Sequence, residues 1–145
     1  MLLFPAHLEP DDNGTFFATC PSLPEVKTYG ESRDDALAHL SDAIEEALGA
    51  RMAHNEELPE AMTAETWDQK SPLAKISTLA TIKYMLYWAL RQAGISRAEL
   101  ARRLHWHREQ VDRLFRIDHA TRLDQFDAAF AALGREMSIE LRKAA

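Results

Sequence analysis

Residues 96–115 read SRAELARRLHWHREQVDRLF, which predicts two short helices joined by a tight turn. Ser96 is a favourable N-cap, and Glu99 three residues later completes a capping box at the start of the first helix. Apolar residues at helical spacing give each helix one face for a core: Leu100, Ala101 and Leu104 in the first, Val111, Leu114 and Phe115 in the second. Together these signals predict a helix-turn-helix.

The remaining positions of this stretch are polar and mostly basic. They are Arg97, Arg102, Arg103, His107, Arg108, Glu109, Gln110 and Arg113, with Arg116 directly after the stretch. Side chains of these types reach the phosphates and base edges of DNA, so the second helix is a candidate recognition helix. An ordinary helical hairpin with a solvated basic face is the alternative that the pattern leaves open.

The charge of the chain is unevenly distributed. The 145 residues carry a net charge of −6, but residues 1–77 hold 5 Lys and Arg against 15 Asp and Glu, whereas residues 78–145 hold 12 against 8. A basic segment suits DNA, because neutralising phosphates supplies most of the sequence-independent affinity. The acidic segment would be repelled by a duplex and should face solvent or a basic partner. We therefore expect two domains, residues 1–77 and residues 78–145, with different partners.

The composition, 46% hydrophobic and 28% charged, is typical of a soluble globular protein. No run approaches the roughly 18 apolar residues of a membrane span, and the N-terminus lacks the charged and apolar regions of a signal peptide. The single cysteine, Cys20, has no partner for an internal disulfide or a metal site. We expect a cytoplasmic protein without membrane attachment, metal or cofactor.

The acidic half begins with three predicted strands. Residues 2–8 form the first, in which Pro5 favours an edge position or a bulge because it has no N–H for the ladder. Asn13-Gly14 predicts a hairpin turn to a second strand over residues 15–19. The third strand covers residues 26–29 and stops at Gly30.

A helix and a fourth strand complete this half. Ser32 and Asp35 predict a capping box, and the helix that follows should end near residues 52–54. Residues 59–72 are irregular, with Trp67 as the anchor to a core, and residues 73–76 form a short strand. The order β-β-β-α-β makes an α+β unit.

The basic half is predicted to be helical up to residue 134. A first helix ends at Gly94, which suits a left-handed C-cap. After the helix-turn-helix, Thr121 and Asp124 predict another capping box and a helix that ends at Gly134. Three apolar residues then alternate with polar ones and predict a short C-terminal strand: Met137, Ile139 and Leu141. A lone strand needs a partner, so pairing with a two-fold mate would build a dimer, and a frayed tail is the alternative.

The N-terminal segments resemble the HicB antitoxin domain. The resemblance rests on Leu23-Pro24-Glu25-Val26, Thr28-Tyr29-Gly30-Glu31-Ser32 and Asp35-Ala36, which follow the hairpin in the order typical of that family. Residues 99–103, 112–115 and 119–121 resemble the Cro/repressor-type helix-turn-helix of one branch of these antitoxins. The two resemblances together cover nearly the whole chain.

The resemblance implies both a fold and a function. HicB proteins are antitoxins of type II toxin–antitoxin pairs. Their N-terminal domain, similar to a truncated RNase H fold, binds HicA, a small basic toxin that cleaves mRNA through a histidine. Their C-terminal domain binds the promoter of the operon as a homodimer or higher oligomer and represses it. The acidic and basic halves of this chain agree with these two partners.

The family pattern, carried over by position, assigns roles in binding double-stranded operator DNA. The residues that open the recognition helix would meet base edges: His107, Arg108, Glu109 and Gln110. Four arginines would hold phosphate: Arg97, Arg113, Arg116 and Arg122. Arg113 could instead read guanine. His105 stands where the family usually has glycine, although histidine tolerates the left-handed conformation of the turn.

The toxin contacts are assigned from charge alone, to Asp11, Asp12 and Glu31 at loop tips of the acidic half. Catalysis is not expected, because a two-metal nuclease needs converging carboxylates and residues 2–8 contain none. His105-x-His107 lacks a further ligand at metal-binding spacing. A stand-alone transcriptional repressor, whose acidic domain senses a ligand or oligomerises, is the alternative function.

Overall fold

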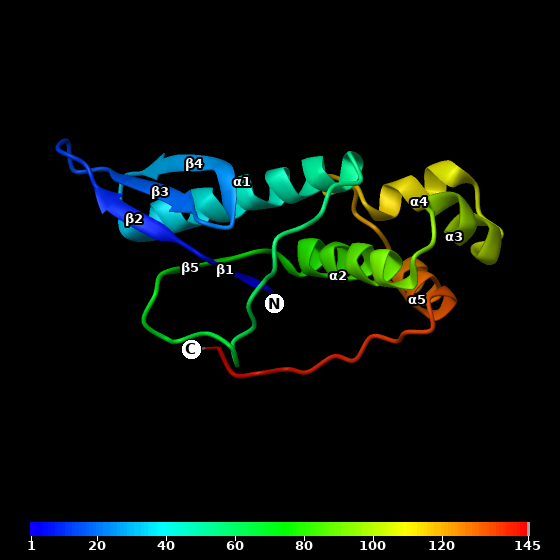
Figure 1. Ribbon diagram of the computed structural model, residues 1–145. Coiled ribbons are helices and arrows are strands. Elements are labelled where there is room, and N and C mark those ends of the chain that lie inside the picture. The colour runs from blue at the N-terminus through cyan, green and yellow to red at the C-terminus, as the bar shows by residue number, and fades with distance from the viewer. Residues whose placement is uncertain (145) are drawn as a thin grey trace.

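The computed structural model describes residues 1–144 and has an α+β architecture, with a sheet region at the N-terminus followed by several helices (Figure 1). The strands are β1 (Leu3–Pro5), β2 (His7–Pro10), β3 (Phe16–Cys20), β4 (Leu23–Gly30) and β5 (Leu73–Lys75). The helices are α1 (Arg33–Ala53), α2 (Thr78–Ala93), α3 (Arg97–Leu104), α4 (Arg108–Leu114) and α5 (Leu123–Ala132). None of the helices within residues 1–144 combines the length and apolar character that crossing a membrane requires.

The first predicted strand is split at Ala6 into β1 and β2. The N–H of Ala6 donates to the Pro72 carbonyl at 2.9 Å and so extends the pairing of β1 with the segment before Leu73, whereas Pro5 has no N–H to give. β1 then pairs with β5, while β2 pairs with β3 and β3 with β4, all antiparallel. The predicted hairpin between β2 and β3 is confirmed, with Gly14 at a φ of +82°.

Helix α1 begins where the sequence predicts. The Ser32 hydroxyl accepts from the Asp35 N–H at 3.0 Å, although the Asp35 carboxylate accepts from Glu31 rather than from Ser32. Every fourth residue of α1 is buried, and this face packs on β3 and β4: Ala36, Leu40, Ile44, Leu48 and Met52. Gly30, the last residue of β4, lies so close to α1 that a Cβ there would be 2.2 Å from the Ala36 nitrogen.

Helix α2 connects the two halves of the molecule (Figure 1). It is capped by Ser77 at its start and by Gly94, at a φ of +66°, at its end. The hydroxyl groups of Tyr84 and Tyr87 donate to backbone carbonyls in the segment between α1 and β5. The buried residues form one continuous core, which runs from Phe4 in β1 to Phe126 in α5.

Trp67 does not anchor residues 59–72 to this core. Its ring is half-buried, and its indole N–H donates to the Ser71 carbonyl in the same loop at 3.0 Å. Leu58 and Ala61 pack against the core instead.

The predicted C-terminal strand is absent, because residues 135–144 form neither helix nor strand. A strand exists only when its backbone groups pair with another strand, and the single chain offers no such partner to this segment. The segment is held by side chains, since Arg135 lies 5.0 Å over the Trp88 ring and Arg142 pairs with Glu65 at 2.7 Å. It runs back along the molecule from α5, below α2 in Figure 1.

Candidate nucleic-acid interface

The turn between α3 and α4 adopts the conformation that the sequence predicts. His105 is left-handed, with φ 56° and ψ 37°, and the Trp106 N–H donates to the Ala101 carbonyl at 3.0 Å. The His107 N–H then donates to the Gln110 side-chain oxygen at 2.8 Å, which starts α4. Leu100 of α3 and Val111 of α4 are fully buried, so the helix pair has one face in the core and the other in solvent.

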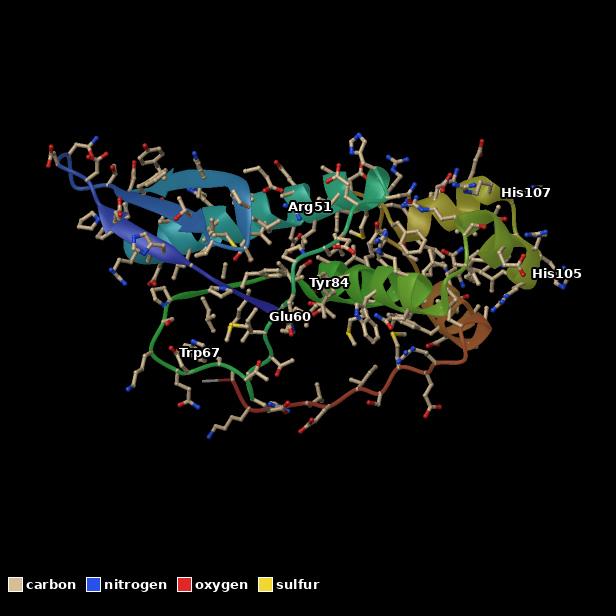
Figure 2. The ribbon with its side chains drawn as sticks, viewed as in Figure 1. Arg51, Glu60, Trp67, Tyr84, His105 and His107 are labelled. Atoms are coloured by element: carbon tan, nitrogen blue, oxygen red, sulfur yellow. The ribbon has the colours of Figure 1, made fainter. Side chains whose placement is uncertain are left out.

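Most of the predicted DNA-contacting residues are exposed on this helix pair and the loop after it: His107, Arg108, Glu109, Arg113, Arg116 and Arg122. His107 and His105 lie at the end of the molecule farthest from the sheet (Figure 2). Gln110 is partly buried, and its side-chain oxygen is engaged in capping α4. The structure therefore places the residues that open α4 on one accessible end of the molecule.

Three of the exposed arginines form ion pairs with neighbouring carboxylates. Arg108 pairs with Asp112 at 3.1 Å, Arg116 with Asp118 at 3.1 Å, and Arg122 with Asp124 at 3.0 Å. Exposed pairs of this kind contribute only about 0–1 kcal/mol, so a phosphate can replace the carboxylate at little cost. The Arg116 guanidinium also lowers the pKa of Asp118 below its usual range.

Arg97 lies elsewhere than the sequence predicts. Its side chain is only 10% exposed and is directed into the contact between α1 and α4. Nη2 donates to the Met52 carbonyl at the end of α1, Nη1 donates to Asp112 Oδ1 at 3.3 Å, and the guanidinium lies 4.7 Å over the Phe115 ring. With these partners, Arg97 is a poor candidate for a phosphate contact.

Lys83 of α2 supports the helix pair from inside the core. Its buried Nζ donates to the Arg113 carbonyl in the last turn of α4 and to the Thr121 hydroxyl, both at 2.9 Å. Burial lowers the pKa of the Lys83 amine to about 8. The predicted capping box of Thr121 with Asp124 does not form. Arg122 is the N-cap of α5, and the Thr121 hydroxyl accepts from Lys83.

Sequence reasoning missed Lys83, although a signal was present. Leu86 and Leu90 lie three and seven residues after it, so Lys83 falls on the apolar face of α2. A lysine at such a position must find oxygen acceptors inside the protein, because an unpaired buried charge is costly.

An open cleft of about 580 Å³ lies between α1 and the helix pair. Glu46 and Gly49 line it from α1, and Arg108 and Arg116 line it from α4 and the residue after Phe115. The acidic half thus reaches the edge of the exposed basic face. Within residues 1–144, no group of three or more His, Cys, Asp or Glu side chains is placed to hold a metal ion.

The three acidic residues assigned to toxin binding are exposed. Asp11 and Asp12 belong to the loop between β2 and β3, and Glu31 follows β4. Because Pro10 pairs with Phe16 and Phe16 with Gly30, these residues lie at the same end of the three-stranded sheet. The structure brings together carboxylates that are about 20 residues apart in the sequence.

The apolar residues assigned to dimerisation differ in exposure. Met137 is half-buried against the core, whereas Ile139 and Leu141 are 82% and 94% exposed. Two large apolar side chains are therefore left in solvent in the single chain.

Comparison with known proteins gives one family and several relatives. Residues 3–83 match the family model described as HicB_like antitoxin of bacterial toxin-antitoxin system. The chain is 32% identical over 139 residues to Antitoxin HicB of Pseudomonas fluorescens, covering 95% of this chain and 91% of that protein. It is 31% identical over 138 residues to Antitoxin HicB of Escherichia coli K12, covering 94% and 96%.

Among solved structures, the chain is similar to the N-terminal domain of Burkholderia pseudomallei antitoxin HicB. The match has 24% sequence identity and a TM-score of 0.41, and it covers 52% of this chain and 96% of that domain.

Proposed function

The chain belongs to the HicB-like antitoxin family of bacterial toxin–antitoxin systems, and from this premise we propose that it neutralises a HicA-like toxin and represses its own operon. One observation carries the proposal: identity of about 31–32% extends over more than nine-tenths of the chain, and so includes both the sheet region and the helices that follow it. The protein acts by binding in the cytoplasm and has no catalytic role.

Toxin capture belongs to the acidic half, residues 1–77, which we propose to be a truncated RNase H-like domain. The proposed partner is a small basic protein that cleaves mRNA. Asp11, Asp12 and Glu31 provide a cluster of carboxylates at one end of the sheet, where they are free to pair with basic side chains. Complementary charge speeds the encounter and disfavours wrong partners.

Co-expression with the neighbouring small open reading frame tests this role. The toxin alone should arrest growth, and the full-length antitoxin should restore growth and retain the toxin in a pull-down. Replacing Asp11, Asp12 and Glu31 with Lys should weaken retention, whereas Asp68→Lys, in the loop before β5, should not. Intact operator binding without any toxin partner would favour the stand-alone repressor.

Operator binding belongs to residues 78–145, through a Cro/repressor-type helix-turn-helix formed by α3 and α4. The residues that open α4 meet base edges: His107, Arg108, Glu109 and Gln110. Arg113 reads guanine or holds the backbone, and Arg116 and Arg122 hold phosphate. Arg97 does not belong to this set, because its side chain is buried and its Nη1 and Nη2 groups donate inside the protein.

Arg108→Ala should weaken binding to operator DNA by about 1–3 kcal/mol and relax the preference at one base position. Arg116→Ala should weaken binding to operator and random DNA alike, because a phosphate contact carries no sequence information. Titrations of both variants on both DNAs at several salt concentrations measure the difference. Equal losses on the two DNAs for Arg108→Ala would contradict the base-reading role.

Two helix pairs related by a two-fold axis can read half-sites about 34 Å apart. We propose that residues 137–141 pair with their two-fold mates, gain the strand structure that the single chain lacks, and bury Ile139 and Leu141. Ile139→Asp combined with Leu141→Asp should reduce the molar mass measured by light scattering to that of a monomer. A dimeric double variant would place the interface elsewhere.

A further inference from the structure

The most unusual side chain of the basic half is that of Arg97. It is nine-tenths buried, and it touches three separate parts of the fold through the Met52 carbonyl, Asp112 and the Phe115 ring. Its Nε is buried without a hydrogen-bond partner. A buried guanidinium is costly unless its partners are well placed, so such a group fixes the geometry of whatever surrounds it.

The Met52 carbonyl belongs to the last turn of α1, where the helix dipole favours a positive charge. Arg97 opens α3, so the contact links the end of the acidic half's long helix to the start of the helix pair. A second close approach lies between α1 and the segment after α4. Gly49 of α1 is so near Ile117 that an added Cβ would lie 2.9 Å from the Ile117 side chain. The segment that follows α4 is therefore packed closely on α1 at Gly49, beside the open cleft.

Asp112 connects Arg97 to the exposed face. The same oxygen, Oδ1, accepts from Arg97 Nη1 at 3.3 Å and from Arg108 Nε at 3.1 Å. Arg97 holds the carboxylate from the buried side, and Arg108 meets it from the solvent side. The position of a proposed base-reading arginine thus depends on a carboxylate that Arg97 fixes in place.

We infer that Arg97 is a positioning residue for operator recognition, which is held at the end of α1 and orients Arg108 through Asp112. The inference rests on the proposed operator binding. The acidic half then contributes to DNA binding, because the carbonyl that accepts from Arg97 belongs to Met52 of α1. Arg97 acts through Arg108 and touches no phosphate.

The test compares Arg97→Met with Arg91→Met in the full-length protein. Arg91 is a matched control, since it also donates to a carbonyl beyond the end of α1, that of Asn55 at 3.1 Å, and also lies over an aromatic ring, that of Tyr87. It makes no contact with Asp112. Arg97→Met should weaken operator binding about tenfold, a coupling typical of neighbouring groups, and Arg91→Met less than about twofold.

Two measurements distinguish a positioning role of Arg97 from a direct phosphate contact and from a general effect on stability. The slope of log affinity against log salt should be unchanged in Arg97→Met, whereas a lost phosphate contact would reduce it by about 0.9. In an Arg108→Ala background, Arg97→Met should cost less than about twofold, because the residue it orients is gone. A reduced slope, additive losses, or equal effects of Arg97→Met and Arg91→Met would overturn the inference.

Asp112→Asn provides a second route if Arg97→Met does not fold. It keeps the size of the side chain and removes the shared charge, and its effect on operator affinity should also vanish in the Arg108→Ala background. Additive losses would again overturn the inference. Failure of the wild-type protein to bind operator DNA would instead refute the proposed repression, and the inference with it.

Discussion

His105 carries backbone strain at a position where the sequence departs from the usual glycine. It adopts a φ of 56° in a position where glycine is free of the steric cost of a Cβ. His105→Gly should raise the free energy of unfolding by about 0.5–1 kcal/mol. Glycine removes the steric penalty of the left-handed conformation in the folded state, and the greater entropy of glycine in the unfolded chain offsets part of this gain. Urea denaturation measures this, with His107→Gly as the control, because His107 has a φ of −71° and should gain nothing. An unchanged stability in His105→Gly would show that the turn is not strained.

Lys83 should make the stability of the protein depend on alkaline pH. Its pKa is about 8 in the folded protein because of burial, against 10.5 for an ordinary lysine. Between these values the unfolded chain binds more protons than the folded one, so the contribution of Lys83 to the free energy of unfolding rises from pH 8 to 10.5. Below pH 8, Lys83 is protonated in both the folded and the unfolded protein, so its contribution to the free energy of unfolding does not change with pH.

The comparison of Lys83→Met with the wild-type protein isolates this effect from other titrating groups. Chemical denaturation at several pH values should show a smaller rise in stability for the variant between pH 8 and 10.5. Lys75→Met, at an exposed position of β5, should retain the wild-type rise. Parallel profiles for wild type and Lys83→Met would contradict the assignment.

Among the elements, the junction of β4 with α1 is the least tolerant of added volume. Gly30→Ala would place a Cβ 2.2 Å from the Ala36 nitrogen, and because that contact is backbone, the helix must shift. We expect a loss of about 2–3 kcal/mol in the free energy of unfolding, typical of overpacking. Gly14→Ala is the control, since that site is open and only its φ of +82° opposes a side chain, at a cost of about 1 kcal/mol. Similar losses at both glycines, measured in urea, would show that the junction can relax.

Element starts and turns could be predicted from the sequence because their signals are local. Ser32 and Ser96 each cap a helix as predicted, and the hairpin and the left-handed turn at His105 lie where the sequence places them. Thr121 is the exception, because Arg122 is the N-cap of α5. Elements that depend on a distant partner could not be predicted in the same way. The break at Ala6 depends on Pro72, and the C-terminal segment has the alternation of a strand but no partner in a single chain.

At the scale of the whole molecule, the candidate site was only partly predictable. Residue type and helical spacing identified the exposed face of α4, because those properties do not depend on the rest of the fold. They could not show that Arg97 turns inward, since its acceptor at Met52 lies 45 residues away. They also gave no reason for Gly49 inside a helix, which the close approach of Ile117 provides.

The continuous core bears on the expected boundary at residue 77, which stays a prediction. Arg97, Tyr84 and Tyr87 all bond to carbonyls between residues 52 and 59, so neither half keeps its hydrogen-bond partners if the other unfolds. Calorimetry of the full-length protein should therefore give one transition, with equal calorimetric and van't Hoff enthalpies. In Gly49→Val the added side chain would clash with Ile117 and weaken the contact between α1 and the segment after α4. The two halves should then melt in separate transitions. Two transitions in the wild-type protein would instead mean that the halves unfold independently, and that the contacts of Arg97 contribute little to holding them together.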